Sequence, residues 1–285
     1  MTQIGFIGLG MMGVPMADRL LDRGFTLTVQ DADRARQEGF LARHPNARGA
    51  HGARDFAACS ALITMLPNSD IIDEVVLGLL PHLVAGTTII DMSSADPNRT
   101  RTLARKLREK QVDLIDAPVS GGVKKAVAGT LAIMAGGDPE VLQRTRPLLE
   151  AMGTNITHVG PVGAGHALKA LNNYVSAAAL IATAEAIHVG AAFGIEPPVI
   201  VDVINASTGR NNTTENKARQ FMLNGAFNSG FSLALQAKDV GIATALGRAM
   251  GKSMRLGEHV DAITHAAADE LGPAADHTEL YRYVD

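Results

Sequence analysis

A short apolar run followed at once by closely spaced glycines is the feature that most restricts how this chain can fold. Residues 8–13 read Gly-Leu-Gly-Met-Met-Gly, directly after the expected strand Gln3–Ile7. In a G-x-G-x-x-G turn of this kind, Gly8 would allow a tight turn, Gly10 would let the main chain approach a bound group, and Gly13 would permit close helix packing. The chain contains 29 glycines, so the pattern alone could describe an ordinary turn, and its surroundings decide its value.

The surroundings of the glycines favour a dinucleotide site. Asp31 lies 18 residues after Gly13, at the end of a second expected strand, Thr26–Gln30. Strand, glycine turn, helix and acid in this order are typical of a βαβ unit that binds pyrophosphate at the helix N-terminus and ribose hydroxyls at the acid. Asp31 would repel a 2′-phosphate and so favours NAD, although Arg34 is close enough to bind that phosphate, which keeps NADP open. The expected cofactor contacts here are Gly8, Leu9, Gly10, Met11, Met12, Gly13 and Asp31.

The pattern along the rest of the chain predicts two domains. Short β-rich runs alternate with helical stretches up to about residue 160, and alanine-rich segments of helical period follow Gly163. We expect an α/β fold: a Rossmann-type, doubly wound parallel-sheet domain over 1–163, then an all-α domain over 164–285. The further strands expected are Ala61–Met65, Thr87–Ile90, Val112–Asp116 and Leu131–Met134. The helices expected are Met12–Arg23, Asn98–Gln111 after the cap Asp96-Pro97, Gly165–Phe193, Val199–Asn205, Thr214–Leu223, Phe231–Met250 and Met254–Leu271.

Composition excludes several classes of function. A net charge of −3 speaks against nucleic acid and anionic membranes as partners. The single cysteine, Cys59, cannot form an internal disulfide, and no basic segment with a long apolar run opens the chain, so we expect a cytoplasmic protein. Nine histidines without metal-binding spacing predict no metal, and the missing Gly-x-Ser-x-Gly motif leaves hydrolysis unsupported. The apolar stretch Ala177–Ala192 carries polar residues and predicts a buried helix rather than a membrane span.

Three further strand ends carry polar or glycine-rich turns. The carboxyl ends of parallel strands share one edge of a sheet, so the turns Met65–Asn68 and Asp91–Ser94 should line the crevice of the dinucleotide. We expect contacts from Leu66, Pro67, Asn68 and Ser94. The turn Asp116–Gly122 offers the Ser120 hydroxyl and unshielded main-chain N–H groups at Gly121 and Gly122, which together can hold a carboxylate. A serine-containing turn without a ligand is the alternative.

A short polar stripe marks the first half of the expected long helix. Lys169, Asn173 and Ser176 follow one another at helical spacing, and the neighbours of the lysine in sequence are apolar. Burial would lower the pKa of Lys169 toward the range useful for acid/base catalysis, and Asn173 would offer an amide to the same small molecule. A solvated lysine on a helix surface is the alternative. His166, one turn earlier, is expected to be structural.

Taken together, the motifs resemble those of the β-hydroxyacid dehydrogenase family, which includes 3-hydroxyisobutyrate dehydrogenase and tartronate semialdehyde reductase. The likeness covers nearly the whole chain. The matching segments are 8–13 with Met16-Ala17, 91–94 with Pro97, 116–122 with Gly129-Thr130-Leu131, 163–165 with 169–173, and 231–235 with Lys238-Asp239.

The resemblance implies a role for each matching residue. Ser120, Gly121 and Gly122 would bind the substrate carboxylate, and Asn173 would orient the reacting group. Lys169 would be catalytic, taking the hydroxyl proton while hydride moves to NAD, or returning it in reduction. Lys238 would close over the cofactor.

The resemblance leaves the substrate open. We expect an NAD-dependent enzyme acting on a small 3-hydroxy acid and its semialdehyde, of the 3-hydroxyisobutyrate type first and the tartronate semialdehyde type second. Lys124, Lys125 and Arg210 add positive charge, and Arg210 favours a polar or doubly anionic substrate. Related imine reductases usually lack a lysine at this position, and a catalytically silent dinucleotide-binding module would have lost it. The alanine-rich helices suggest a homodimer or homotetramer.

Overall fold

The structure, a computed structural model, describes residues 3–285. By their internal contacts these residues form two compact units: unit 1, which ends at Lys169, and unit 2, which spans Ala170–Asp285. The domain boundary expected from the sequence, at residue 163, precedes the long helix, whereas unit 1 also includes the beginning of that helix.

Unit 1 is a sheet covered by helices on both faces. Its strands are β1 (Gln3–Ile7), β2 (Thr26–Gln30), β3 (Arg48–Gly49), β4 (Ala61–Thr64), β5 (Thr88–Asp91), β6 (Asp113–Asp116), β7 (Val119–Ser120), β8 (Leu131–Gly136) and β9 (Gly153–Gly160). Its helices are α1 (Gly13–Asp22), α2 (Arg34–Arg43), α3 (Ser69–Leu79), α4 (Pro97–Arg108), α5 (Gly122–Ala128) and α6 (Pro139–Met152), with short 3₁₀ turns at Ala53–Phe56 and Leu80–His82.

The strand order confirms the predicted fold class. The sheet runs β3-β2-β1-β4-β5-β6, and all of these strands are parallel. The chain moves outward from β1 on one side and from β4 on the other, so the order reverses between β1 and β4, where doubly wound sheets bind their ligands. Beyond β6 the sheet differs from the all-parallel expectation, since β8 is antiparallel to β6 and β7, and β9 pairs with β8.

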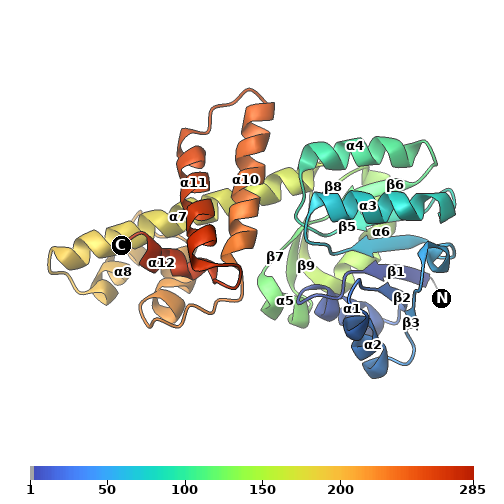
Figure 1. Cartoon of the computed structure of the whole chain (residues 1–285), viewed down its shortest axis with the longest axis horizontal. Helices are drawn as coiled ribbons and strands as arrows, with labels where there is room; N and C mark the ends of the chain where they lie inside the picture. Colours follow the sequence, from blue (N-terminus) through green and yellow to red (C-terminus); the bar gives the residue numbers. More distant parts are fainter. Residues whose placement is uncertain (1–2) are drawn as a thin grey trace. The chain divides into compact units, whose positions relative to one another are not determined.

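Side chains that alternate along each strand build two cores, one on each face of the sheet. In β4, Ile63 packs with the cluster that includes α1 and α6, and Leu62 packs with the cluster that includes α3 and α4. Ile90 and Ile89 of β5 divide in the same way. Figure 1 shows α3 and α4 along one face of the sheet and α1 on the other. Continuously apolar strands are what a sheet buried on both faces requires.

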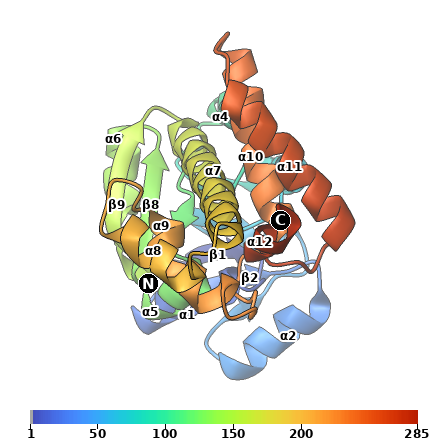
Figure 2. The same cartoon turned by 90° about the vertical axis from the view of Figure 1, so that its left-hand side faces the viewer.

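All the regular elements that the structure describes in unit 2 are helices. Most of α7 (Ala164–Ala192) belongs to it, followed by α8 (Pro197–Asn205), α9 (Asn212–Asn216), a π-helical turn at Ala218–Met222, α10 (Leu233–Ala249), α11 (Arg255–Leu271), a 3₁₀ turn at His277–Glu279 and α12 (Leu280–Tyr283). Helices α10 and α11 run side by side (Figure 2). Their Val240 and Val260 share one core with Leu180 of α7.

Two helices in unit 2 differ from the sequence expectation. The helix expected over Thr214–Leu223 is broken, because Lys217 leaves the helical conformation with φ −127° and ψ −44°. The expected burial of Ala177–Ala192 applies to one side of α7 only: Leu180 is buried, whereas Val189 is 72% exposed. Helix α7 is long and apolar enough to cross a membrane. Core helices of soluble proteins meet the same criterion of length and composition.

Candidate functional site

In the glycine turn between β1 and α1, two glycines pack closely against backbone atoms and the third has free space beside it. Gly8 has φ +102° and donates a 2.9 Å hydrogen bond to the Gln30 carbonyl oxygen. A Cβ on Gly8 would overlap the carbonyl oxygen of Met65, and a Cβ on Gly13 would overlap that of Gly8. A Cβ on Gly10 would meet no atom within 4 Å. The turn therefore leaves space beside Gly10, and the first turn of α1 contains no acidic residue that would repel an anion there.

The carboxylate of Asp31 ties the glycine turn to the end of β2. Its Oδ2 accepts a 2.6 Å hydrogen bond from the Leu9 N–H, and its Oδ1 accepts one of 2.8 Å from the Asp33 N–H. Sequence reasoning assigned Asp31 to ribose hydroxyls and missed this contact with the turn. Arg34 is exposed at the start of α2, the helix that Asp33 caps.

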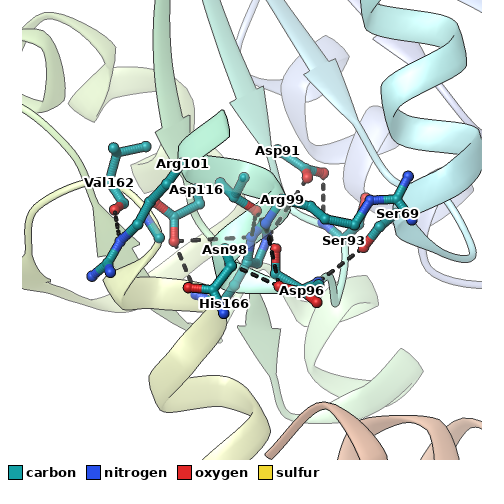
Figure 3. Close-up of polar contacts among 12 residues, drawn as sticks. Ser69, Asp91, Ser93, Asp96, Asn98, Arg99, Arg101, Asp116, Val162 and His166 are labelled. Carbon is teal, nitrogen blue, oxygen red and sulfur yellow. Dashed lines mark hydrogen bonds and ion pairs between the residues drawn. The ribbon is translucent and has the colours of Figure 1, made fainter. Parts of the chain in front are cut away.

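The turns after β4 and β5 are joined through Ser93. The Ser93 hydroxyl accepts a 2.9 Å hydrogen bond from the Leu66 N–H, and the Ser93 N–H donates at 3.1 Å to Asp91 Oδ1. Figure 3 shows Ser93 beside the Asp91 carboxylate. The expected contact residues Leu66, Pro67, Asn68 and Ser94 thus lie on two turns that are bonded together. Asn68 has a structural task as well, since its Oδ1 caps α3 by accepting from the Ile71 N–H at 3.0 Å.

The turn after β6 presents main chain rather than side chains. Gly121 and Gly122 are exposed and have φ +128° and +65°, a region that favours glycine. A Cβ on Gly121 would also collide with the side chain of Lys125. Ser120, the last residue of β7, is partly exposed. The hydroxyl and the main chain expected to bind a carboxylate are therefore accessible.

Helix α7 carries the two predicted side chains of its polar stripe, one in each unit. Lys169, partly exposed, is the last residue of unit 1. In unit 2, Asn173 is 7% exposed, and its Nδ2 donates a 2.5 Å hydrogen bond to Asp239 Oδ2. Lys238 Nζ lies 3.4 Å from Asp239 Oδ1. The carboxylate of Asp239 therefore lies between two predicted site residues.

Sequence reasoning gave no role to Asp239 or to Lys217. Asp239 stood beside Lys238 in a matching motif, which was a usable signal. Lys217 Nζ lies 3.3 Å from the hydroxyl of Ser176, the third residue of the polar stripe, and burial lowers the pKa of Lys217 to about 8. Nothing in the local sequence marks Lys217, because its partners come from distant segments. Among residues 3–285, no group of three or more His, Cys, Asp or Glu is arranged to hold a metal ion.

Comparison with known proteins covers both units. Residues 3–160 match the family described as the NAD binding domain of 6-phosphogluconate dehydrogenase, and residues 163–284 match the NAD-binding family of NADP-dependent 3-hydroxyisobutyrate dehydrogenase. The chain belongs to the β-hydroxyacid dehydrogenase family. It is thus an NAD(P)-dependent hydroxyacid dehydrogenase, as the resemblance implied.

Individual members of the family are similar over most of their length. The 2-(hydroxymethyl)glutarate dehydrogenase of Eubacterium barkeri is 40% identical over 86% of this chain and 82% of its own. The NAD-dependent L-serine dehydrogenase of Pseudomonas aeruginosa is 40% identical over 90% and 89%. The structure of Mycobacterium tuberculosis 3-hydroxyisobutyrate dehydrogenase with L-serine superimposes with a TM-score of 0.93 at 33% identity, covering 99% of this dehydrogenase and 98% of that chain.

Proposed function

We propose that this dehydrogenase interconverts a small 3-hydroxy acid and its semialdehyde, with a substrate of the 3-hydroxyisobutyrate type. One observation carries the proposal: 3-hydroxyisobutyrate, L-serine and 2-(hydroxymethyl)glutarate, named for the three similar proteins, all carry a CH₂OH group and a carboxylate on one carbon. Reduction of tartronate semialdehyde, the alternative, yields the same unit with a hydroxyl as the third substituent. The proposal therefore concerns this shared unit.

The glycine turn fits NAD. The space beside Gly10 would admit the pyrophosphate to the N-terminus of α1, where main-chain N–H groups and the helix dipole attract an anion. Asp31, already bonded to Leu9, would accept the ribose hydroxyls and disfavour a 2′-phosphate, so we infer NAD rather than NADP. Leu66, Pro67, Asn68 and Ser94 would line the same crevice, and Lys238 would contribute from unit 2. When bound, NAD supplies the acceptor or donor of the hydride.

The chain's own residues would bind the acid and move one proton. Ser120, Gly121 and Gly122 would donate hydrogen bonds to the substrate carboxylate. Lys169 would take the hydroxyl proton during oxidation and return it to the aldehyde oxygen during reduction. The Asn173 amide donates one N–H to Asp239, and its second N–H would orient the reacting oxygen.

A substrate panel tests the proposed reaction. The purified enzyme would be assayed for NAD⁺ reduction with 3-hydroxyisobutyrate, L-serine and 2-(hydroxymethyl)glutarate, and for NADH oxidation with tartronate semialdehyde. We expect turnover with at least one compound and the highest kcat/KM for 3-hydroxyisobutyrate. If NADH binds tightly but no compound is turned over, the chain is a dinucleotide-binding module and the proposed reaction is wrong.

The role of Lys169 is tested by Lys169→Ala. Loss of the acid/base group should lower kcat about 10²- to 10⁴-fold. The Kd for NADH, measured by fluorescence titration, should stay near that of the wild type. Lys110→Ala removes an exposed lysine and serves as the control. Equal kcat in Lys169→Ala and Lys110→Ala would mean that another group transfers the proton.

We also infer that the protein self-associates through α7 and α8. These helices pack together where Gly190 faces Ile200, and each exposes valines: Val175 and Val189 on α7, Val199 and Val203 on α8. Exposed apolar side chains on neighbouring helices favour an interface between like subunits.

A further inference from the structure

The Asp116 carboxylate is a buried charge held by the beginning of α7. The residue has no exposed surface, and burial raises its pKa. Its Oδ1 accepts a 2.7 Å hydrogen bond from the Gly163 N–H, and its Oδ2 accepts one of 2.9 Å from the His166 N–H (Figure 3). Main-chain N–H groups at a helix N-terminus and the helix dipole are what stabilises a carboxylate away from water. Asp116, from the end of β6, therefore acts as the cap of a helix that begins 48 residues later at Ala164.

Two glycines allow α7 and β8 to lie directly against this carboxylate. A Cβ on Gly136 at the end of β8 would lie 2.6 Å from Asp116 Oδ1, and a Cβ on Gly165 would lie 2.9 Å from Asp116 Oδ2. A Cβ on Gly165 would also overlap the carbonyl oxygen of Met134. The first turn of α7 therefore has no room to move toward the sheet without displacing the carboxylate.

The side chain of His166 contacts α4 and lies close to the end of β5. Its side chain is fully buried, its Nδ1 lies 2.8 Å from the Thr100 hydroxyl, and its Nε2 lies 3.7 Å from Asp91 Oδ2. The other oxygen of Asp91 accepts from the Thr64 hydroxyl at 2.9 Å and from the Ser93 N–H. The beginning of α7 is thus hydrogen-bonded to α4 and lies close to Asp91 at the end of β5, a strand that carries one of the proposed cofactor turns.

We propose that Asp116 is a positioning residue for Lys169. The inference rests on the proposed acid/base role of Lys169, which lies three residues after His166 on the same helix. Asp116 accepts from the Gly163 and His166 N–H groups where α7 begins, and so it sets the axial position and the rotation of the first turn, from which the helix continues to Lys169. Neither carboxylate oxygen is accessible, so Asp116 acts through the helix and not on the substrate. A displacement of about 1 Å in a catalytic group can cost about 100-fold in rate.

Asp116→Asn tests the inference without changing the volume at the site. The amide oxygen can accept from one N–H, whereas the amide NH₂ faces the other, so the turn loses a hydrogen bond and the charge. We expect kcat to fall about 10- to 100-fold, while the KM of the hydroxy acid and the Kd of NADH stay near the wild-type values. Asp116→Ser is the second variant: a serine also caps helices but reaches only one of the two N–H groups.

Asp138→Asn is the matched control. Asp138 caps α6 from the same unit by accepting from the Glu140 and Val141 N–H groups at 2.8 and 3.3 Å, and α6 carries none of the proposed site residues. We expect its kcat to be unchanged. If Asp116→Asn has the kcat of the wild type, or if both Asp116 variants lose NADH binding, Asp116 serves only the fold and the inference is overturned. Lys169→Ala in parallel separates the two proposals, because full activity in that variant contradicts the proposed function itself.

Discussion

A methyl group added at Gly10 meets different surroundings from one added at Gly13. The Cβ of Gly10→Ala would lie in open space, in the position proposed for the pyrophosphate, and φ at Gly10 lies outside the left-handed region. Gly10→Ala should therefore keep the melting temperature and weaken NADH binding at least about tenfold, since a tenfold loss is only about 1.4 kcal/mol. Thermal unfolding and fluorescence titration measure the two effects.

Gly13→Ala should act on stability first. Its Cβ would overlap the Gly8 carbonyl oxygen, so α1 must move relative to β1. Forced overpacking costs about 1–3 kcal/mol, a fall of several degrees in melting temperature. Gly39→Ala, in α2 and with no atom within 4 Å of the added Cβ, is the control and should be neutral or slightly stabilising. If Gly13→Ala is as stable as Gly39→Ala, Gly13 does not pack closely against the Gly8 carbonyl oxygen.

Candidate site residues can be proposed from sequence where they follow a strand directly. Parallel strands end at one edge of a sheet, so Asp31, Ser94 and the turn after β6 are predicted to share one site. The contacts of Asp116 with Gly163 and His166, and of Asn173 with Asp239, join residues at least 47 positions apart. Such pairs depend on how the elements pack, which local patterns do not describe.

Lys217 explains why an expected helix is interrupted. At this residue the backbone leaves α9, the side chain reaches Ser176 on α7, and the next turn is π-helical. Burial lowers the pKa of Lys217 to about 8, although the negative charge of Asp276 acts in the opposite direction. Local propensity favoured one continuous helix over Thr214–Leu223, and tertiary contacts such as the part-buried one between Lys217 and Ser176 override it.

Lys217→Met should raise the free energy of unfolding at neutral pH. A pKa lowered from 10.5 to about 8 means that the unfolded chain binds more protons between these values, so wild-type stability rises with pH across this window. At pH 7 the charged lysine lowers the free energy of unfolding by about 3 kcal/mol at most. Methionine removes this charge but also the contact with Ser176, so Lys217→Met should raise the free energy of unfolding by about 1–3 kcal/mol. Urea unfolding at pH 7 and pH 10 measures both values. If Lys217→Met is less stable than the wild type at pH 7, or if its stability still rises toward pH 10, the partly buried lysine does not destabilise the fold.

Strands with apolar patterns were predicted, and those without them were missed. Strands β1 and β2 have the predicted bounds, β4 ends one residue earlier than predicted, and β5 is shifted by one residue toward the C-terminus. Strand β9 was missed because Thr154, Asn155, Thr157 and His158 are exposed and interrupt the alternation. Strand β7 has two residues, too few for any pattern.

At the scale of the whole molecule, two domain types followed from the change in periodicity, but the direction of β8 did not. Alternating strands and helices imply parallel pairing. The segment between β6 and β8 contains instead the strand β7 and the short helix α5, and β8 returns antiparallel to β7. Strand direction depends on the connection, which hydrophobic pattern alone does not specify.

Self-association is the property of the whole molecule that the exposed apolar side chains predict. Val189 lies in the last turn of α7 and Phe193 directly follows the helix; they are 72% and 84% exposed. A lysine introduced at an interface between like subunits is present in each subunit, so like charges repel each other across the symmetry axis. Each lysine must also lose its hydration, which further weakens association. Val189→Lys combined with Phe193→Lys should therefore shift sedimentation from an oligomer to the monomer.

The control for this shift is Val84→Lys, which changes another exposed valine, 56% exposed, in unit 1. It should leave the oligomer intact, because a single exposed valine on a folded surface needs no partner. Both proteins should bind NADH, since the glycine turn and Asp31 lie in unit 1, away from the substituted ends of α7 in sequence. Sedimentation at two protein concentrations decides the matter: if the double variant and Val84→Lys sediment alike, the end of α7 is not part of the interface, and the exposed valines of α8 become the next segment to substitute.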